Sequence, residues 1–292
     1  MLIIGCSKGR HLGKAIAEHL GIEYIELEVK RFPDNEIYLR YPKGVSGEDV
    51  VFVQSFYGEI NDALVEVIFA AETAEDLGAK RLILAAPYFP YLRQDKRFKE
   101  GECISLRTVA GVIDDFFDEI MIIDPHLHRE KTLSHIFKIH SKKLTADHLI
   151  AAYIKENIKN PLLVGPDEES YRWAKKTAED IGAESVILEK ERHSGREVTV
   201  FFNKEINAKD KNIVIVDDII STGNTLIETI KHLKQAGARK ITCIAVHGIF
   251  TDNSLARLSE TGAKIISTNT IPNETAEMDV SKIIADALKK EK

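Results

Sequence analysis

Short apolar runs, each followed by a polar loop and an amphipathic segment, alternate along most of this chain. The β-branched runs predict strands buried on both faces, and apolar spacings of three and four predict helices between them. Strand–helix alternation predicts an α/β fold of mostly parallel sheets flanked by helices, joined by right-handed crossovers. The predicted strands are 2–4, 24–29, 50–53, 82–86, 120–123, 162–164, 186–188, 213–216, 241–246 and 264–267. The predicted helices are 11–20, 61–77, 104–117, 145–157, 170–181 and 225–236.

The two halves of the chain follow one plan. Residues 50–66 and 213–228 each read as an apolar strand, a polar loop and a helix start that ends in an acidic residue. Their continuations, 78–87 and 237–246, each open with a glycine suited to a helix C′ position and lead into another strand. Two matches in the same order predict a duplication. We therefore expect two related domains, 1–143 and 144–292, with the boundary near residues 140–147.

Composition narrows the class of protein. Of 292 residues, 44% are hydrophobic and 29% are charged, which is typical of a soluble globular protein. The net charge of −6 argues against generic nucleic-acid binding. No apolar run is long enough for a membrane span or a signal peptide. The three scattered cysteines read as reduced packing residues, so we expect a cytoplasmic protein.

The segment 213–226, IVIVDDIISTGNTL, carries the clearest chemical signal. Asp217 and Asp218 stand near the end of the predicted strand, and a small polar loop then leads into a helix. Backbone N–H groups at a helix N-terminus bind anions, and adjacent acids can hold hydroxyl groups, so the segment predicts a sugar-phosphate site. An ordinary turn with Thr225 as the helix N-cap is the alternative. Two uncompensated acids at the end of an apolar strand favour the functional interpretation.

A second group of polar residues follows other predicted strands. Asp124 and His126 follow strand 120–123, and Asp167 follows strand 162–164. Carboxylate and imidazole together can hold a divalent cation, directly or through waters. Loop residues that cap helices are one alternative. A zinc hydrolase using Asp124, His126 and His128 is another, but it lacks a further ligand at metal spacing.

Three cationic or aromatic segments complete the candidates. In 89–97, FPYLRQDKR, Arg93 could grip phosphate and Gln94 could read a base or ribose edge. In 31–36, RFPDNE, an aromatic ring stands beside two acids, although alone this is only a turn. In 189–197, Lys190 and Arg192 could stabilise a transition state on a closing loop, while a solvated hairpin is the plainer interpretation. No P-loop or protein-kinase signature is present.

Taken together, FPYLRQDK, DPH, KER, VDDIISTGNT and HGIF closely resemble the ribose-phosphate pyrophosphokinase family. The resemblance runs from RFPDNE to TNTIPN, nearly the whole chain. It implies two phosphoribosyltransferase-like domains, the first on the ATP side and the second on the ribose 5-phosphate side. It also implies transfer of a pyrophosphoryl group from Mg-ATP to the 1-hydroxyl of ribose 5-phosphate, with release of AMP, in a homo-oligomer.

The resemblance assigns roles by position. Lys190 and Arg192 would be catalytic, and His126 and Asp167 would be linked to Mg²⁺. The adenine pocket, formed by Phe32, Asp34 and Glu36, would come from a neighbouring subunit. The remaining ATP residues would be Arg93, Gln94 and Asp95. The ribose 5-phosphate residues would be Asp217, Asp218, Ser221, Thr222, Gly223, Asn224 and Thr225.

Some positions depart from the common pattern of the family. Ser221 stands where many relatives carry Asp, and Asn224 where many carry Gly. These traits and the ending ALKKEK look like the archaeal branch. Two other functions share parts of the pattern. A phosphoribosyltransferase would consume the activated sugar but would not need Arg93, Gln94 or the Lys190 and Arg192 pair. A regulatory homologue would keep the fold without turnover.

Overall fold

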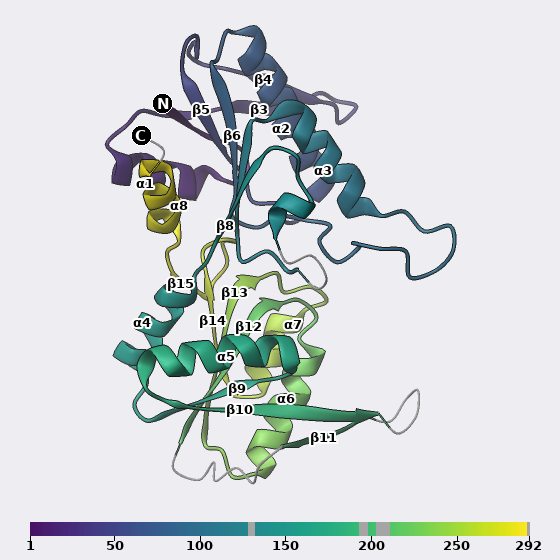
Figure 1. The fold of residues 1–292 in the computed structure, drawn as a ribbon, viewed down its shortest axis with the longest axis vertical. Helices are drawn as coiled ribbons and strands as arrows, with labels where there is room; N and C mark the ends of the chain where they lie inside the picture. Colours follow the sequence, from purple (N-terminus) through teal and green to yellow (C-terminus); the bar gives the residue numbers. More distant parts are fainter. Residues whose placement is uncertain (128–131, 193–197, 203–210, 291–292) are drawn as a thin grey trace. The chain divides into compact units, whose positions relative to one another are not determined.

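A computed structural model describes residues 1–127, 132–192, 198–202 and 211–290 of the chain. It divides into two compact units (Figure 1). The first unit contains Met1–Thr145 and Val280–Lys292, and the second contains Ala146–Asp279. The expected second domain, 144–292, therefore differs from the second unit in its last segment, which belongs to the first unit.

The first unit is built on a six-stranded sheet with strand order β2-β1-β5-β6-β7-β8, and every pair in it is parallel. The strands are β1 (Leu2–Gly5), β2 (Tyr24–Glu26), β5 (Asp49–Val53), β6 (Arg81–Ala86), β7 (Glu119–Ile123) and β8 (His140–Leu144). A separate antiparallel hairpin consists of β3 (Glu28–Arg31) and β4 (Ile37–Arg40). The helices are α1 (Arg10–Leu20), α2 (Ile60–Asp76), α3 (Ser105–Phe116), the short 3₁₀ turn η1 (Leu133–His135) and α8 (Ser281–Lys289).

The second unit has a seven-stranded sheet with strand order β11-β10-β9-β12-β13-β14-β15. All its pairs are parallel except β10 with β11. The strands are β9 (Pro161–Gly165), β10 (Glu184–Arg192), β11 (Val198–Phe202), β12 (Asn212–Ile220), β13 (Lys240–Gly248), β14 (Lys264–Thr268) and β15 (Ala276–Met278). The helices are α4 (Asp147–Asn157), α5 (Glu168–Ile181), α6 (Asn224–Gln235) and α7 (Ser254–Glu260).

The two sheets have the same topology once β11 is set aside. Strands β2-β1-β5-β6-β7-β8 of the first unit match β10-β9-β12-β13-β14-β15 of the second in order and direction. The sequence match of 50–66 with 213–228 falls on β5–α2 and β12–α6, which hold corresponding places. The predicted fold of two duplicated, mostly parallel α/β domains is confirmed.

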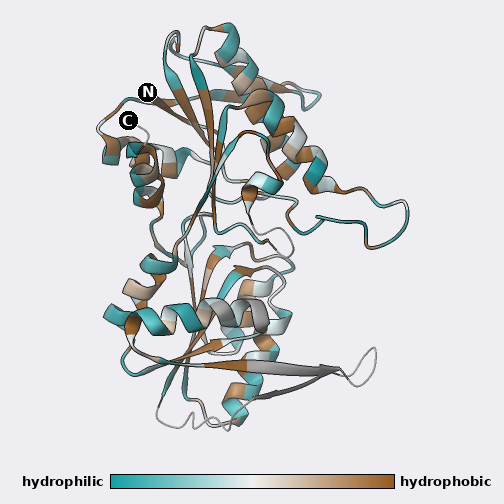
Figure 2. Cartoon of the chain, viewed as in Figure 1, coloured by the Kyte–Doolittle hydropathy of each residue, from teal (hydrophilic) through white to brown (hydrophobic). Residues whose placement is uncertain are grey.

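Buried apolar residues on the strands form a core in each unit, and Figure 2 shows hydrophobic residues concentrated on the central strands. Ile4, Phe52 and Leu84 are fully buried in the first unit, and Val164 and Ile230 in the second. Among the described residues, no helix is long and apolar enough to cross a membrane.

Several elements differ from the prediction. The expected strand 24–29 is divided, because β2 joins the sheet while β3 leaves it to pair with β4. The strand expected at 186–188 continues to Arg192, because its charged residues pair with β11. The last helix, α8, packs on α1 and buries Ile284 and Leu288 in the first unit.

Candidate active site

The segment 213–226 folds as a strand, a short loop and a helix at the centre of the second sheet. Strand β12 lies between β9 and β13 and runs past both acids to Ile220. We call residues 221–225, which follow it, the cradle loop. Gly223 is the N-cap of α6 with a φ of 70°, and the first helical hydrogen bond runs from Ile227 N–H to its carbonyl, at 2.9 Å. The helix thus starts inside the loop.

The cradle loop has the features of an anion site. Its residues Thr222, Asn224 and Thr225 are exposed. No described residue accepts a hydrogen bond from the N–H groups of residues 222–225. Thr225 lies within the first turn of α6, so it is not the N-cap that the plainer interpretation required. Unpaired N–H groups and hydroxyls at a helix N-terminus are suited to a phosphate group.

Two carboxylates from neighbouring strands of the second sheet share one hydroxyl group. Asp167 is the N-cap of α5 and accepts a hydrogen bond from Ser170 N–H at 2.9 Å. The Ser170 hydroxyl lies 2.8 Å from Asp167 Oδ1 and 2.9 Å from Asp217 Oδ1. Because β9 and β12 are adjacent parallel strands, Asp167, which follows β9, is brought close to Asp217, which lies near the carboxyl end of β12. Asp167, Asp217 and Asp218 therefore form a carboxylate cluster.

The electrostatics of this cluster favour a bound cation. Burial raises the pKa of Asp217 well above its ordinary value, and the charges of Asp218 and Asp167 raise it further. Hydrogen bonds from Ser170 and from Asp218 N–H lower it in part. A divalent cation would offset the repulsion between these carboxylates. In the described part of the chain no three His, Cys, Asp or Glu side chains are arranged to hold a metal together. Asp167 and Asp217 are the residues of this cluster that could hold such a cation, since Mg²⁺ keeps several waters and needs only one or two protein carboxylates.

The first unit lacks this carboxylate cluster. Strand β5 corresponds to β12, so Gln54 and Ser55 stand where the second unit has Asp217 and Asp218. Gln54 is fully buried and its side-chain oxygen accepts a hydrogen bond from Lys8 N–H at 2.8 Å. A neutral amide bonded to backbone replaces a carboxylate, so the duplicated position carries no charge for a cation.

The predicted catalytic pair lies on β10. The backbones of Lys190 and Arg192 pair with Val200 and Val198 of β11, in an antiparallel hairpin. The loop expected to begin at residue 189 is therefore strand as far as Arg192. The rest of that segment, residues 193–197, lies outside the described residues. The catalytic role of the pair stays a prediction.

Three of the predicted ATP residues stand at the tip of the β3–β4 hairpin in the first unit. Phe32, Asp34 and Glu36 are exposed, and Phe32 has 49% of its surface accessible. The Phe32 ring meets Tyr38 edge to face, with 5.9 Å between ring centroids. Asn35 closes the turn with a φ of 71°. The hairpin presents an aromatic ring and two carboxylates outward.

The other three ATP candidates follow β6. Arg93 is exposed, whereas Gln94 is turned into its own loop. The Gln94 amide nitrogen lies 3.3 Å from Lys96 O and 3.2 Å from Cys103 O. Glu102 accepts hydrogen bonds from two backbone N–H groups of the same loop, which lowers its pKa. Gln94 and Glu102 therefore shape the loop that carries Arg93.

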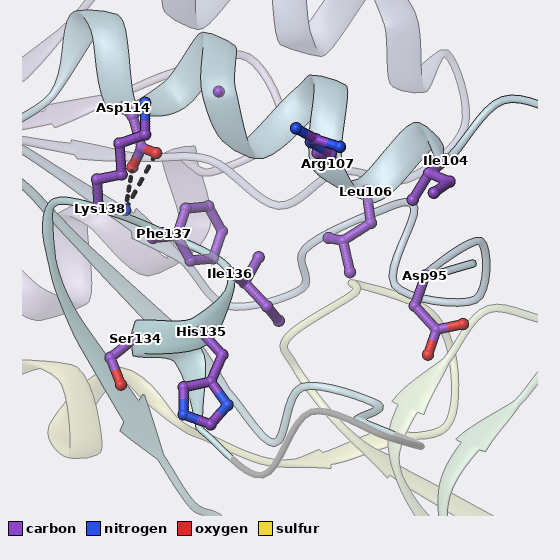
Figure 3. Close-up of a pocket in the computed structure, with 11 residues that line it drawn as sticks. Asp95, Ile104, Leu106, Arg107, Asp114, Ser134, His135, Ile136, Phe137 and Lys138 are labelled. Atoms are coloured by element: carbon purple, nitrogen blue, oxygen red, sulfur yellow. Dashed lines mark hydrogen bonds between the residues drawn. The ribbon is translucent and has the colours of Figure 1, made fainter.

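Asp95 lines a pocket of about 540 Å³ in the first unit (Figure 3). One wall comes from α3, with Leu106 and Arg107, and another from residues 134–138. The Asp114 carboxylate accepts the N–H of Lys138 at 2.9 and 3.1 Å and so joins these walls. The pocket combines apolar and charged groups next to the Arg93 loop.

His126 and Asp124 follow β7, as predicted. Asp124 is buried with a φ of 37°, and His126 is half-buried. His128, the further ligand of the zinc alternative, lies outside the described residues. His126 belongs to the first unit and Asp167 to the second, so each is described within its own unit. Their shared link to a metal stays a prediction.

Four residues that contact this site are not among the predicted site residues. Ser170 joins the carboxylate cluster, and its signal was the Asp-x-x-Ser spacing of a helix N-cap. The Ser221 hydroxyl lies 3.3 Å from Thr251 Oγ1, and the Ser254 hydroxyl donates to Ser221 O at 2.6 Å. Arg257 donates to Thr222 O and to Asn224 Oδ1. Nothing in the local sequence marked these last three.

Comparison with known proteins gives consistent matches to both units. Residues 1–116 match the family described as the N-terminal domain of ribose phosphate pyrophosphokinase, and residues 133–281 match the phosphoribosyl transferase domain. The chain is 37% identical to the ribose-phosphate pyrophosphokinase of Saccharolobus solfataricus over 294 residues, covering 99% of this chain and 100% of the relative. The Pyrococcus abyssi protein of the same name is 34% identical over 291 residues, covering 100% and 99%.

A solved structure agrees with these relatives. Phosphoribosylpyrophosphate synthetase from Mycobacterium smegmatis superposes with a TM-score of 0.86 at 26% identity, covering 99% of this chain and 98% of that one. Both units are therefore matched in a single protein.

Proposed function

The chain belongs to the ribose-phosphate pyrophosphokinase family and is an enzyme of that type, and we propose that it transfers the pyrophosphoryl group of Mg-ATP to the 1-hydroxyl of ribose 5-phosphate. The products are 5-phosphoribosyl 1-pyrophosphate, used in nucleotide biosynthesis, and AMP. One observation carries the assignment of the sugar site: Asp217 and Asp218 of the carboxylate cluster lie on β12, the strand that leads directly into the cradle loop. Carboxylates can accept hydrogen bonds from ribose hydroxyls, and N–H groups can bind the 5-phosphate, so these groups suit ribose 5-phosphate.

In this proposal the sugar is bound at the second unit. The N–H and hydroxyl groups of residues 221–225 hold the 5-phosphate, and Asp217 and Asp218 accept hydrogen bonds from the ribose hydroxyls. This arrangement orients the 1-hydroxyl as the nucleophile, and positioning is most of what phosphoryl chemistry requires of a protein. The Ser170 hydroxyl keeps Asp167 and Asp217 together while the sugar binds.

ATP is assigned to the residues of the first unit. Arg93 and Asp95 contact the nucleotide, and Gln94 holds the loop that carries them. The 1-hydroxyl oxygen forms a bond to the β-phosphorus, the bond from the β-phosphorus to the α,β-bridging oxygen breaks, and AMP leaves with that oxygen. The hydroxyl proton passes to solvent. Lys190 and Arg192 neutralise charge that accumulates on the transferred group.

Bound Mg²⁺ would neutralise phosphate charge and align the two reacting groups. Asp167 and the neighbouring Asp217 would hold it on the sugar side, mostly through water, and His126 is the candidate on the nucleotide side. The raised pKa of Asp217 supports this assignment, because carboxylates that repel one another gain from a cation.

We also propose a homo-oligomer in which the hairpin tip of one chain completes the adenine site of another. Exposed large apolar side chains on the first unit support self-association; they include Phe32, Val65 and Phe69. All three cysteines are free thiols, which supports the cytoplasm as the compartment. Light scattering of the purified protein tests the oligomer, and a monomer at assay concentration would refute it.

A direct assay tests the function. Purified protein is incubated with ATP, Mg²⁺ and ribose 5-phosphate, and nucleotides are separated with and without added inorganic phosphate. We expect AMP and not ADP, and only when the sugar phosphate is present. Release of ADP would mean single-phosphoryl transfer, and no nucleotide conversion would favour a regulatory homologue. A phosphoribosyltransferase would consume 5-phosphoribosyl 1-pyrophosphate with a base and would leave ATP unchanged.

A further inference from the structure

Consecutive carbonyl groups at the start of the cradle loop are all held from one side, by residues 249–257. Across a trans peptide, a carbonyl and the next N–H group point in opposite directions. The N–H groups of residues 221–223 therefore face away from residues 249–257. The contacts are Ile249 N–H and Phe250 N–H to Ile220 O at 2.9 and 3.2 Å, the Ser254 hydroxyl to Ser221 O at 2.6 Å, and the Arg257 guanidinium to Thr222 O.

Among these donors, only Arg257 carries a charge. Its other terminal nitrogen donates to Asn224 Oδ1 at 3.0 Å, so both of its acceptors are neutral. Its Nε atom is buried and has no hydrogen-bond partner among the described residues. Within that same part of the chain, no carboxylate lies within ion-pair distance of the guanidinium. Burying part of a cation without a counter-ion costs free energy, and a bound anion would offset that cost.

Arg257 also links two elements. Helix α7 carries it beside α6 (Figure 1). Its two contacts, Thr222 and Asn224, lie on either side of Gly223 in the sequence. The guanidinium fork is rigid, so two simultaneous contacts fix the direction of the Thr222 carbonyl and of the Asn224 side chain. The residue therefore both shapes the loop and places positive charge behind it.

We propose that Arg257 is a positioning residue for the phosphate monoester of the sugar substrate. It keeps the N–H groups of the cradle loop turned toward the ligand, and its own charge is balanced by the bound phosphate dianion. The inference rests on the proposed ribose 5-phosphate site and deepens it, because it assigns part of phosphate recognition to a residue outside the loop.

Two substitutions separate the effect of the Arg257 charge from the effect of its hydrogen bonds to the cradle loop. Arg257→Gln keeps an amide donor for Thr222 O but removes the charge, whereas Arg257→Lys keeps the charge but loses the fork. Arg239→Gln is the matched control, because Arg239 is an exposed arginine of the same unit just before β13. The measurements are calorimetric binding of ribose 5-phosphate without ATP, the KM values for both substrates, and the thermal unfolding midpoint of each variant.

We expect Arg257→Gln to weaken ribose 5-phosphate binding by about tenfold, while its KM for ATP changes less than about twofold. Arg257→Lys should recover most of the lost affinity, and Arg239→Gln should match the wild type. Wild-type affinity in Arg257→Gln would overturn the inference, and so would an equal loss for both substrates or a Lys variant as weak as the Gln variant. If Arg257→Gln does not fold, the Lys variant decides: it must lose affinity for ribose 5-phosphate and not for ATP, because it keeps the charge but not the fork. Failure of the wild-type protein itself to bind the sugar phosphate would refute the proposed function instead.

Discussion

The hydroxyl of Ser170 lies 2.9 Å from a carboxylate oxygen of Asp217 and bridges it to the N-cap of α5. A hydroxyl has one hydrogen, so it can donate to only one carboxylate at a time. The Asp167 oxygen, 2.8 Å away, also accepts the Ser170 N–H at 2.9 Å, so it keeps a donor when the hydroxyl donates to Asp217. Ser170 therefore connects the N-cap of α5, which follows β9, to Asp217 on the neighbouring strand β12.

Ser170→Ala should move the acid limb of the kcat/KM profile to higher pH. The hydroxyl lowers the pKa of Asp217, which burial has already raised, so its removal leaves Asp217 harder to ionise. Because the ionised carboxylate is needed, Ser170→Ala should lose activity at a higher pH than the wild type does on acidification. Ser259→Ala is the control, since that hydroxyl only contacts Leu255 O within α7. Superimposable profiles for Ser170→Ala and wild type would contradict this role.

Asp217→Asn should stabilise the metal-free protein while weakening sugar binding. The pKa of Asp217 is raised in the folded state, so that state binds the proton more tightly than the unfolded chain does. The stabilisation that Asp217 gives to the folded state is fully present at a pH below the ordinary pKa of a carboxyl group. It falls as the pH rises toward the raised pKa of the folded state, and it is absent above that pKa. Removing the charge should raise the unfolding midpoint at high pH by roughly 2–4 °C, the shift typical of about 1 kcal/mol.

Thermal unfolding with and without Mg²⁺ measures this effect. Added Mg²⁺ should stabilise the wild type and narrow the gap to Asp217→Asn, because the cation offsets the same repulsion. Asp180→Asn, an exposed acid on α5, should behave as wild type throughout. An Asp217→Asn variant that is less stable than wild type at high pH would show that the ionised Asp217 carboxylate stabilises the folded protein.

The parts of the site that were predictable are local in sequence. Strand β12, its two acids and the loop before α6 all follow from a β-branched run, a charge pair and a small polar segment that leads into a helical pattern. The duplication was also visible, because equivalent strands and helices keep the same order of residue types.

The parts that were not predictable depend on distant partners. Ser170 reaches Asp217 across 47 residues, and Arg257 reaches Thr222 across 35. The division of segment 24–29 into β2 and β3 follows from which partner strand each half finds. Similarly, chain order places residues 281–289 in the expected second domain, but they form α8, whose apolar face packs on α1. Contacts between residues far apart in the sequence decide each of these features, so the local sequence does not predict them.

Lys190→Ala should lower turnover by at least about a hundredfold and leave ribose 5-phosphate affinity nearly unchanged. Its proposed role is to stabilise charge that develops only in the transition state, so its loss should appear in kcat. Single-turnover rates and calorimetric binding of the sugar phosphate separate the two effects. Lys175→Ala is the control, because Lys175 is an exposed residue of α5 that pairs with Glu179. Near-normal turnover in Lys190→Ala would remove the residue from the mechanism.

Phe32→Ala and Lys190→Ala should complement each other if the adenine site is shared between chains. Phe32 is exposed at a hairpin tip in its own unit, as expected for a ring that serves a neighbouring chain. A hybrid dimer would have one site with both defects and one with neither. Refolding or coexpressing the two variants at equal amounts should restore about a quarter of wild-type activity in a symmetric dimer. Activity equal to the mean of the separate variants would show that each chain builds its own site.

Gly223→Ala should impair sugar binding beyond its effect on stability. Gly223 has a φ of 70°, and a Cβ atom there would lie 3.1 Å from the Leu258 side chain. Gly237 is the matched control: its φ is 91°, and a Cβ atom there would have no described atom within 4 Å. Both alanine variants should lose about 1–2 kcal/mol of stability from the left-handed backbone. Only Gly223→Ala should shift the cradle loop and raise the KM for ribose 5-phosphate, by roughly tenfold. Denaturant unfolding measures the loss of stability, and steady-state kinetics measure the KM for ribose 5-phosphate. Equal KM values in the two variants would show that the conformation of the cradle loop does not affect phosphate binding.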